Sequence, residues 1–128
     1  QDARGARATV AVCGVGAVLM HAHNLDSIEL HDAKLTSTHI DYAQRVVVIE
    51  LDYYPDPVMA RSRVGARIEF RNVVSFSHIA DLAMLEQHAS AGNVTNWWPE
   101  GEGKTYLYLA GGCLIVEATE VHMESRSN

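Results

Sequence analysis

The pattern of apolar and polar positions around which the chain is organised lies between residues 45 and 53. In an extended strand, one face of this stretch is apolar throughout, while the opposite face changes from apolar to acidic. The first face consists of Val47, Ile49, Leu51 and Tyr53, and the second of Val46, Val48, Glu50 and Asp52. Because β-branched residues favour the pleated conformation, we predict a strand over residues 45–54 at the centre of a sheet.

Alternation on either side of this strand predicts an antiparallel meander of three strands. Residues 26–40 alternate apart from an interruption at Asp32-Ala33, which indicates a bulge or a bend. Asp41 suits the first position of a turn into the central strand. Pro55 ends that strand because proline cannot donate to a ladder. Residues 64–73 then alternate again, with one face for the core and one for water.

Two interpretations are open for the residues that follow. A helix over residues 78–89, capped by Ser77, would carry an apolar stripe of Ile79, Leu82, Leu85 and Ala89. Alternatively, the preceding strand continues through Val74, Phe76 and His78. We favour the helix. Beyond it we expect an irregular connection over 91–103 and a hairpin of two strands, 104–110 and 113–122.

These elements predict a mainly β fold of the α+β class. We expect an antiparallel sheet or sandwich of about five to six strands with one helix. The 128 residues are enough for one domain, so residues 1–128 are assigned to a single unit.

Residues 1–24 admit three interpretations. Arg4 and Arg7 precede an apolar run over residues 8–20, a pattern that resembles a secretory signal. Met20 could instead be the natural start, with the preceding residues derived from the clone. If the run is ordered, it forms an extra strand that covers an apolar edge of this chain or of a partner. A dinucleotide-binding turn is rejected, because Leu19 replaces the third glycine of that motif.

Charge and composition narrow the classes of partner. The net charge of −6 argues against a general nucleic-acid binder, which needs a basic face to displace counterions. No stretch is long and apolar enough to span a membrane, and we expect a cytoplasmic protein. Cys13 and Cys113 lie in apolar surroundings and are interpreted as buried free thiols, although a disulfide between them stays open.

Histidines offer one candidate metal site. His21 and His23 would lie on the same face of a strand, an arrangement common among divalent-metal ligands. A third ligand could come from His31, Asp32 or Asp26. The competing interpretation is a set of surface histidines near a terminus, and we expect no cofactor.

Two adjacent tryptophans mark a candidate ligand site in the connection over 91–103. Trp97 and Trp98 cannot easily point the same way, so one can anchor the loop in the core while the other contacts a ligand or a protein. Asn93 and Asn96 of the same loop complete the candidate set. The alternative is that both tryptophans pack as loop anchors.

No arrangement of catalytic residues is evident in the sequence. Neither cysteine has an electropositive context, and no Gly-x-Ser-x-Gly turn is present. Glu50 and Asp52 lie on one strand face, where we interpret them as cross-strand ion pairs with Arg67 and Arg71 and not as an acid–base pair.

Several short segments between Ile28 and Glu117 resemble small uncharacterised β-rich domains, including some immunity proteins of bacterial toxin systems and proteins of mobile cassettes. They are Glu29-x-His31-Asp32, the strand pair 35–53, Phe70-x-Asn72-Val73, Gly92-Asn93-Val94 and Tyr106–Gly112. The resemblance implies a stand-alone binding domain without catalytic residues.

We therefore predict a non-enzymatic binding or interaction module. We expect its partner to be a protein. The alternative is a small enzyme, or a ligand- or metal-binding protein, with a histidine-rich or Trp-lined pocket. Convergent polar groups beneath a tryptophan would favour the alternative, and a flat apolar patch the first hypothesis. Apolar residues on both faces of 8–20, 105–109 and 113–121 further predict a two-fold homodimer.

Overall fold

One antiparallel sheet contains every strand in the described part of the chain. The computed structural model describes residues 17–20, 28–56, 58–59, 61–99 and 103–126. Within them lies one helix, α2 (Leu82–Gln87). The strands are β1 (Ala17–Met20), β2 (Lys34–Asp41), β3 (Val46–Tyr53), β4 (Val64–Ile79), β5 (Val94–Pro99), β6 (Lys104–Leu109) and β7 (Gly112–Arg126). The predicted mainly β, antiparallel fold with one helix is confirmed.

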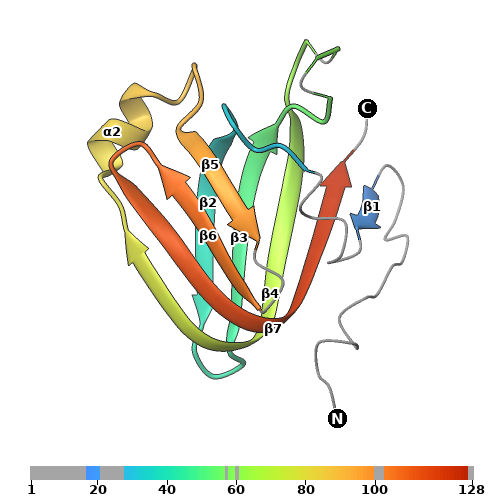
Figure 1. Cartoon of the computed structure of the whole chain (residues 1–128), viewed down its shortest axis with the longest axis vertical. Coiled ribbons are helices and arrows are strands. Elements are labelled where there is room, and N and C mark those ends of the chain that lie inside the picture. The colour runs from blue at the N-terminus through green and yellow to red at the C-terminus, as the bar shows by residue number, and fades with distance from the viewer. Residues whose placement is uncertain (1–16, 21–27, 57, 60, 100–102, 127–128) are drawn as a thin grey trace.

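The two longest strands bend together and give the sheet two arms (Figure 1). The strand order is β2-β3-β4-β7-β6-β5, and β1 pairs with the last residues of β7. Near the bend, Asn72 has a φ of 54°, and a bulge interrupts the β4–β7 register between Val73 and Ser75. A bulge of this kind bends a strand and increases its twist. The first arm therefore holds β2 and β3, and the second holds β5 and β6.

The hydrophobic core lies between the two arms. The alternation in β3 places Ile49 and Leu51 in this core, with exposed fractions of 2% and 1%. The facing arm contributes side chains from β5, β6 and the first part of β7, so each arm covers the apolar face of the other. The core cluster includes Val47, Ile68, Phe70, Val94, Trp97, Leu107, Leu109, Leu114, Val116, Val121 and Met123.

The predicted meander and the final hairpin are confirmed. β2, β3 and β4 pair in sequence order, and β6 pairs with β7 around a turn at Ala110-Gly111. The Asp41 carboxylate accepts a hydrogen bond from the Gln44 amide, as its place in the turn requires. The bulge or bend expected at Asp32-Ala33 is a turn at His31-Asp32, with Asp32 at a φ of 69°, and a separate bulge follows between Leu35 and Ser37.

Three predicted boundaries are wrong. The strand predicted over residues 26–40 begins only at Lys34, because a turn at His31-Asp32 precedes it. The helix does not begin at residue 78, because β4 continues to Ile79 and pairs with β7 along that length. Asp81, and not Ser77, caps α2, accepting a hydrogen bond from the Met84 amide at 3.0 Å. In the stretch expected to be irregular, residues 94–99 form β5 against β6. Pairing with β7, far along the chain, overrides the helical pattern at the end of β4, whereas β5 forms by pairing with β6, the next strand in sequence.

The first and last parts of the chain meet at one edge of β7. Ala17–Met20 pair with the end of β7 as β1, while the other residues before Ile28 lie outside the described part.

Cys113 at the start of β7 is a half-buried free thiol, and Cys13 is among the residues that are not described. None of the described helical residues forms a segment long and apolar enough to cross a membrane.

Candidate functional site

A polar groove lies where three separate segments of the chain converge. It has a volume of about 830 Å³ and opens to solvent. The turn before β2, the loop after β3 and the middle of β5 all contribute to its lining. The seven lining residues are Glu29, His31, Asp32, Tyr54, Arg61, Thr95 and Asn96. We refer to this set as the polar groove.

Contacts between the sheet's two outer strands shape the first wall of the groove. The Asp32 amide donates to the Val94 carbonyl at 3.0 Å, and the Val94 amide donates to the Ala33 carbonyl at 2.9 Å. These bonds join the segment before β2 to the start of β5, so the two arms close at this end. Asp32 has a φ of 69°, a conformation that aspartate tolerates better than most residues.

Gly92 allows this close approach. Its φ is +118°, and a Cβ placed on it would lie 2.5 Å from the Cα atom of Asp32. Such a separation is a steric clash with backbone, which cannot move aside like a flexible side chain. The contact between 92 and 32 therefore depends on a residue without a side chain.

Short-range polar contacts order Glu29, His31 and Asp32. The Glu29 carboxylate accepts a hydrogen bond from the His31 amide at 2.9 Å. The His31 Nδ1 atom lies 3.4 Å from the Asp32 carboxylate, with 61% and 55% of the two side chains exposed. These groups present both acceptors and an ionisable imidazole to solvent. Because the His31 and Asp32 side chains are more than half exposed, they can contact a partner while they stay partly hydrated.

Arg63 holds the second wall against the first. Its guanidinium lies 5.1 Å from the centroid of the Tyr54 ring, within the range of a cation–π contact. The same group donates to the carbonyls of Asp32 and Ser90, each at 3.1 Å. Arg63 thus joins three segments and sets the position of Tyr54 in the groove.

The predicted ligand-binding residues occupy different environments. Asn96 is exposed in the polar groove, and its side-chain oxygen accepts from the Trp97 amide at 2.9 Å. Trp97 is buried in the core and donates its indole N–H to the Ile28 carbonyl at 2.8 Å. Trp97 therefore anchors β5 to the segment before β2. The Trp98 side chain lies outside what the structure describes.

Asn93 lies beneath the groove and not in it. Only 2% of its surface is exposed. Its side-chain oxygen accepts from the Leu35 amide at 2.7 Å, and its side-chain nitrogen donates to the Leu85 carbonyl at 3.1 Å. Its backbone carbonyl accepts from Ala110. The predicted ligand role would require Asn93 to exchange these internal contacts for external ones.

The candidate metal ligands are only partly described. His21, His23 and Asp26 lie outside the described residues, while His31 and Asp32 lie side by side in the polar groove. Among the side chains that are placed, no three histidine, cysteine or carboxylate groups converge in a way that would hold a metal ion. The metal site stays a prediction.

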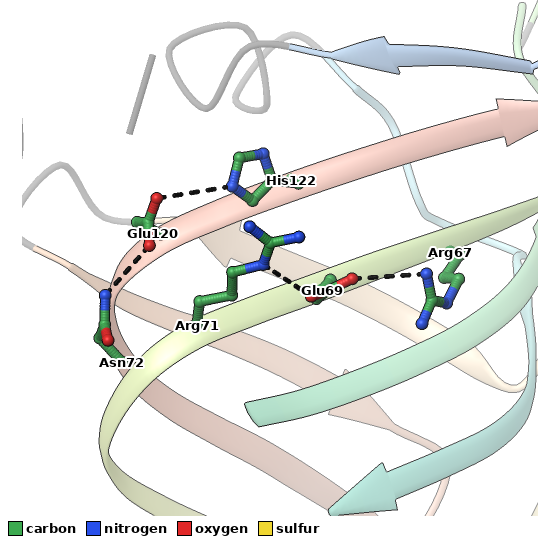
Figure 2. A network of polar contacts seen from close by, with 6 residues as sticks. All are labelled: Arg67, Glu69, Arg71, Asn72, Glu120 and His122. Carbon is green, nitrogen blue, oxygen red and sulfur yellow. Dashed lines mark hydrogen bonds and ion pairs between the residues drawn. The ribbon is translucent and has the colours of Figure 1, made fainter. Parts of the chain in front are cut away.

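A second polar cluster lies on the outer face of β4 and β7 (Figure 2). Glu69 lies between two arginines, 3.4 Å from Arg67 and 2.7 Å from Arg71. On β7, the Glu120 carboxylate accepts a hydrogen bond from the Asn72 side-chain Nδ2 at 3.0 Å and lies 3.8 Å from the His122 Nε2 atom. His122 is 8% exposed, and no hydrogen-bond partner for its Nε2 atom is found in the part of the chain that is described.

This cluster corrects the predicted ion pairs. Glu69, and not Glu50 or Asp52, forms the pairs with Arg67 and Arg71. Glu50 lies opposite Arg67 in the register, but its closest partner is the Ser37 hydroxyl at 2.6 Å. The hydrogen bond from Ser37 lowers the pKa of Glu50, and the charges of His39 and Arg67 lower it further. Asp52 lies opposite Gly65.

Sequence reasoning singled out His31, Asp32 and Asn96 but missed the other side of the polar groove. Tyr54 and Arg61 belong to the loop after β3, in which the sequence pattern predicted no candidate site residue. Their local signal was an aromatic residue and an arginine in one loop, the residue types enriched at binding hot spots.

Comparison of the chain with protein-family models, with curated proteins and with solved structures found no match.

Proposed function

We propose that the protein is a non-enzymatic binding module whose polar groove takes a polar segment of a partner protein. The observation that carries the proposal is the convergence of seven polar or aromatic side chains from three segments on one open groove. The groove offers both signs of charge, because its lining includes the Arg61 guanidinium and the carboxylates of Glu29 and Asp32. A mixed surface of this kind matches the polar rim of a protein interface.

The open geometry favours a macromolecule over a small metabolite. Sites for small ligands are mostly apolar and bury most of the ligand. Here every charged residue of the lining is exposed, and only Tyr54 is half-buried. A small polar ligand would keep most of its contacts with water. A protein segment would gain affinity from the area around the groove as well.

The alternative is a small-ligand or metal-binding protein. It is favoured by one observation, the polar groups of Thr95 and Asn96 directly before the buried Trp97. A thermal-shift screen with zinc, magnesium and polar metabolites separates the two functions. A ligand selective for the native state raises the melting temperature. A rise that is lost in Asn96→Ala would establish the alternative.

A capture experiment with matched variants tests the main proposal. Arg61→Ala removes an exposed positive charge from the groove, and Lys104→Ala removes one from β6, outside the lining. We expect wild type and Lys104→Ala to retain the same protein from a lysate of the source cells, and Arg61→Ala to retain much less. Direct titration of that purified protein then measures the loss. Equal retention by all three would overturn the proposal.

We further propose that the module self-associates as a two-fold dimer. The support is a set of exposed apolar side chains, since large apolar patches on a soluble surface usually mark interfaces. Tyr42, Val74, Ile79 and Leu82 are 84%, 63%, 65% and 75% exposed. Sedimentation velocity at micromolar concentration is expected to give a dimer mass. A monomer mass at every concentration would overturn this proposal and leave the groove proposal standing.

A further inference from the structure

The second half of β4 is a sheet edge in the described structure. β3 pairs with β4 only as far as Phe70, whereas β4 itself extends to Ile79. Residues 74–79 have β7 on one side and no strand on the other among the residues described. Their outward backbone groups are therefore available to a further strand. We refer to residues 74–79 as the free edge.

The free edge lacks the features that protect the other long edges of this sheet. β2 carries Lys34, His39 and Asp41 and a bulge near its start. β5 has a bulge between Val94 and Asn96 and ends at Pro99. Charged residues, bulges and proline all hinder edge-to-edge pairing. The free edge, Val-Ser-Phe-Ser-His-Ile, has no lysine, arginine, carboxylate or proline. Its one bulge is confined to its first residue, Val74, so that residues 75–79 pair with β7 in continuous register.

An apolar groove runs beside the free edge. Its volume is about 500 Å³, and it lies between the β2–β3 turn and the bend of β4. Arg45 fixes the turn there, since its side chain donates to the Val73 carbonyl and its own carbonyl accepts from the Val73 amide, each at 3.0 Å. The apolar lining residues are Ile40, Tyr42, Val46, Val47, Val73, Val74 and Phe76.

We propose that the free edge pairs antiparallel with the free edge of a second copy across a two-fold axis. The inference rests on the self-association proposed above and names its surface. In a fully overlapping pairing, Val74 faces Ile79, Ser75 faces His78 and Phe76 faces Ser77. No charged residue then faces a like charge, and apolar residues meet at both ends of the pair.

The free edge suits a second copy because it can pair with itself without placing like charges opposite each other. Each copy carries a net charge of −6, so two copies repel overall, and a contact surface without carboxylates keeps this repulsion smallest. The free edge has none, and the nearest charges on the groove rim, Asp41 and Arg45, are opposite in sign. In the two-fold pairing, the free edge of each copy is occupied by the free edge of the other. No free edge then remains for a third copy, so association stops at the dimer.

Lysine substitution at the free edge tests the proposal. Ser77→Lys and Val74→Lys each place a charge at an exposed position of the edge, and His39→Lys places one at an exposed position of β2. We expect the first two changes to raise the dimer dissociation constant by about tenfold or more, and His39→Lys to leave it close to wild type. Unchanged denaturation midpoints would show that the variants remain folded.

The outcomes separate the two proposals. A wild-type dimer that persists in both Ser77→Lys and Val74→Lys would overturn the free edge as the interface while self-association stands. Equal weakening by His39→Lys would also overturn it, because the effect would then not depend on the free edge. Hydrogen exchange gives an independent check, since amides within residues 74–79 should gain protection as the concentration rises. Protection confined to another segment would contradict the proposal.

Discussion

At the scale of single residues, Asn93 joins three parts of the fold through its polar groups. Its amide joins the start of β2 to the last turn of α2, and its backbone carbonyl holds the β6–β7 turn. Because the side chain is buried, water cannot replace these partners once it is removed. Asn93 therefore stabilises the floor of the polar groove whatever binds above it.

Asn93→Ala is expected to destabilise the protein by about 2–5 kcal/mol. The Leu35 amide and the Leu85 carbonyl would each lose a partner, and a buried unpaired group costs about 1–3 kcal/mol. Asn96→Ala, at an exposed position three residues farther along the chain, should cost less than about 1 kcal/mol. Urea denaturation of both variants measures the difference. Equal midpoints would contradict the structural role of Asn93.

Ile49→Ala is expected to cost about 2–4 kcal/mol, the usual range for such a change in a core. Ile49 is 2% exposed and packs between the arms. Ile40→Ala, on the neighbouring strand at 38% exposure, serves as the matched control and should cost less. A wild-type midpoint for Ile49→Ala would show that β3 does not fill the core.

At the scale of elements, strands with strict alternation were predictable and the others were not. β3 and the first half of β4 have one face in the core, so period two is visible in their sequence. β5 was missed because Asn, Trp and Pro within a short stretch look like a loop. The second half of β4 fitted helical spacing as well as a strand, and its pairing with β7 decided between them.

Glu50 links β2, β3 and β4, and its pKa predicts an acid-sensitive contribution to stability. The hydrogen bond from Ser37 places the folded-state pKa of Glu50 below its ordinary value of 4.5. The ionised form is thus favoured by folding, and the contribution is present above that value and is lost as pH falls through the folded-state pKa. Glu50→Gln should therefore lower stability at pH 7 and leave a shallower decline below pH 4.5.

Denaturation of wild type and Glu50→Gln across the acid range measures this effect. The side chain is partly exposed, so solvent screening keeps the effect small. Glu86→Gln, which removes an exposed carboxylate from α2, controls for the change in net charge. Parallel stability curves for wild type and Glu50→Gln would contradict the linkage.

At the scale of the whole molecule, contact between the two outer strands defines the site. The segment before β2 and the start of β5 meet through Asp32 and Val94, and this contact brings His31 and Asn96 to one groove. No local pattern in the sequence encodes a contact between residues so far apart. Individual residues of the groove could therefore be singled out, but their convergence with Tyr54 and Arg61 could not.

Gly92→Ala tests the closure of the two arms. The added methyl group would meet the Asp32 backbone at 2.5 Å, and the positive φ adds strain, so we expect a loss of more than about 2 kcal/mol. Gly65→Ala is the control, because its methyl group would find only ordinary contact with Asp52 at 3.7 Å. Circular dichroism melts of both variants measure the effect. Equal stability would show that the arms do not depend on this approach.

The long pairing of β4 with β7 also sets the order in which the chain can fold. Ala66 pairs with Ser125 and Ile79 with Cys113, so these contacts join residues far apart in sequence. Topologies dominated by such contacts fold slowly, on the order of milliseconds to seconds. During synthesis, β4 lacks its longest partner until residues 112–126 have left the ribosome. In that interval β3 can already pair with the first half of β4, while the edge of β4 that later pairs with β7 stays open to non-native contacts.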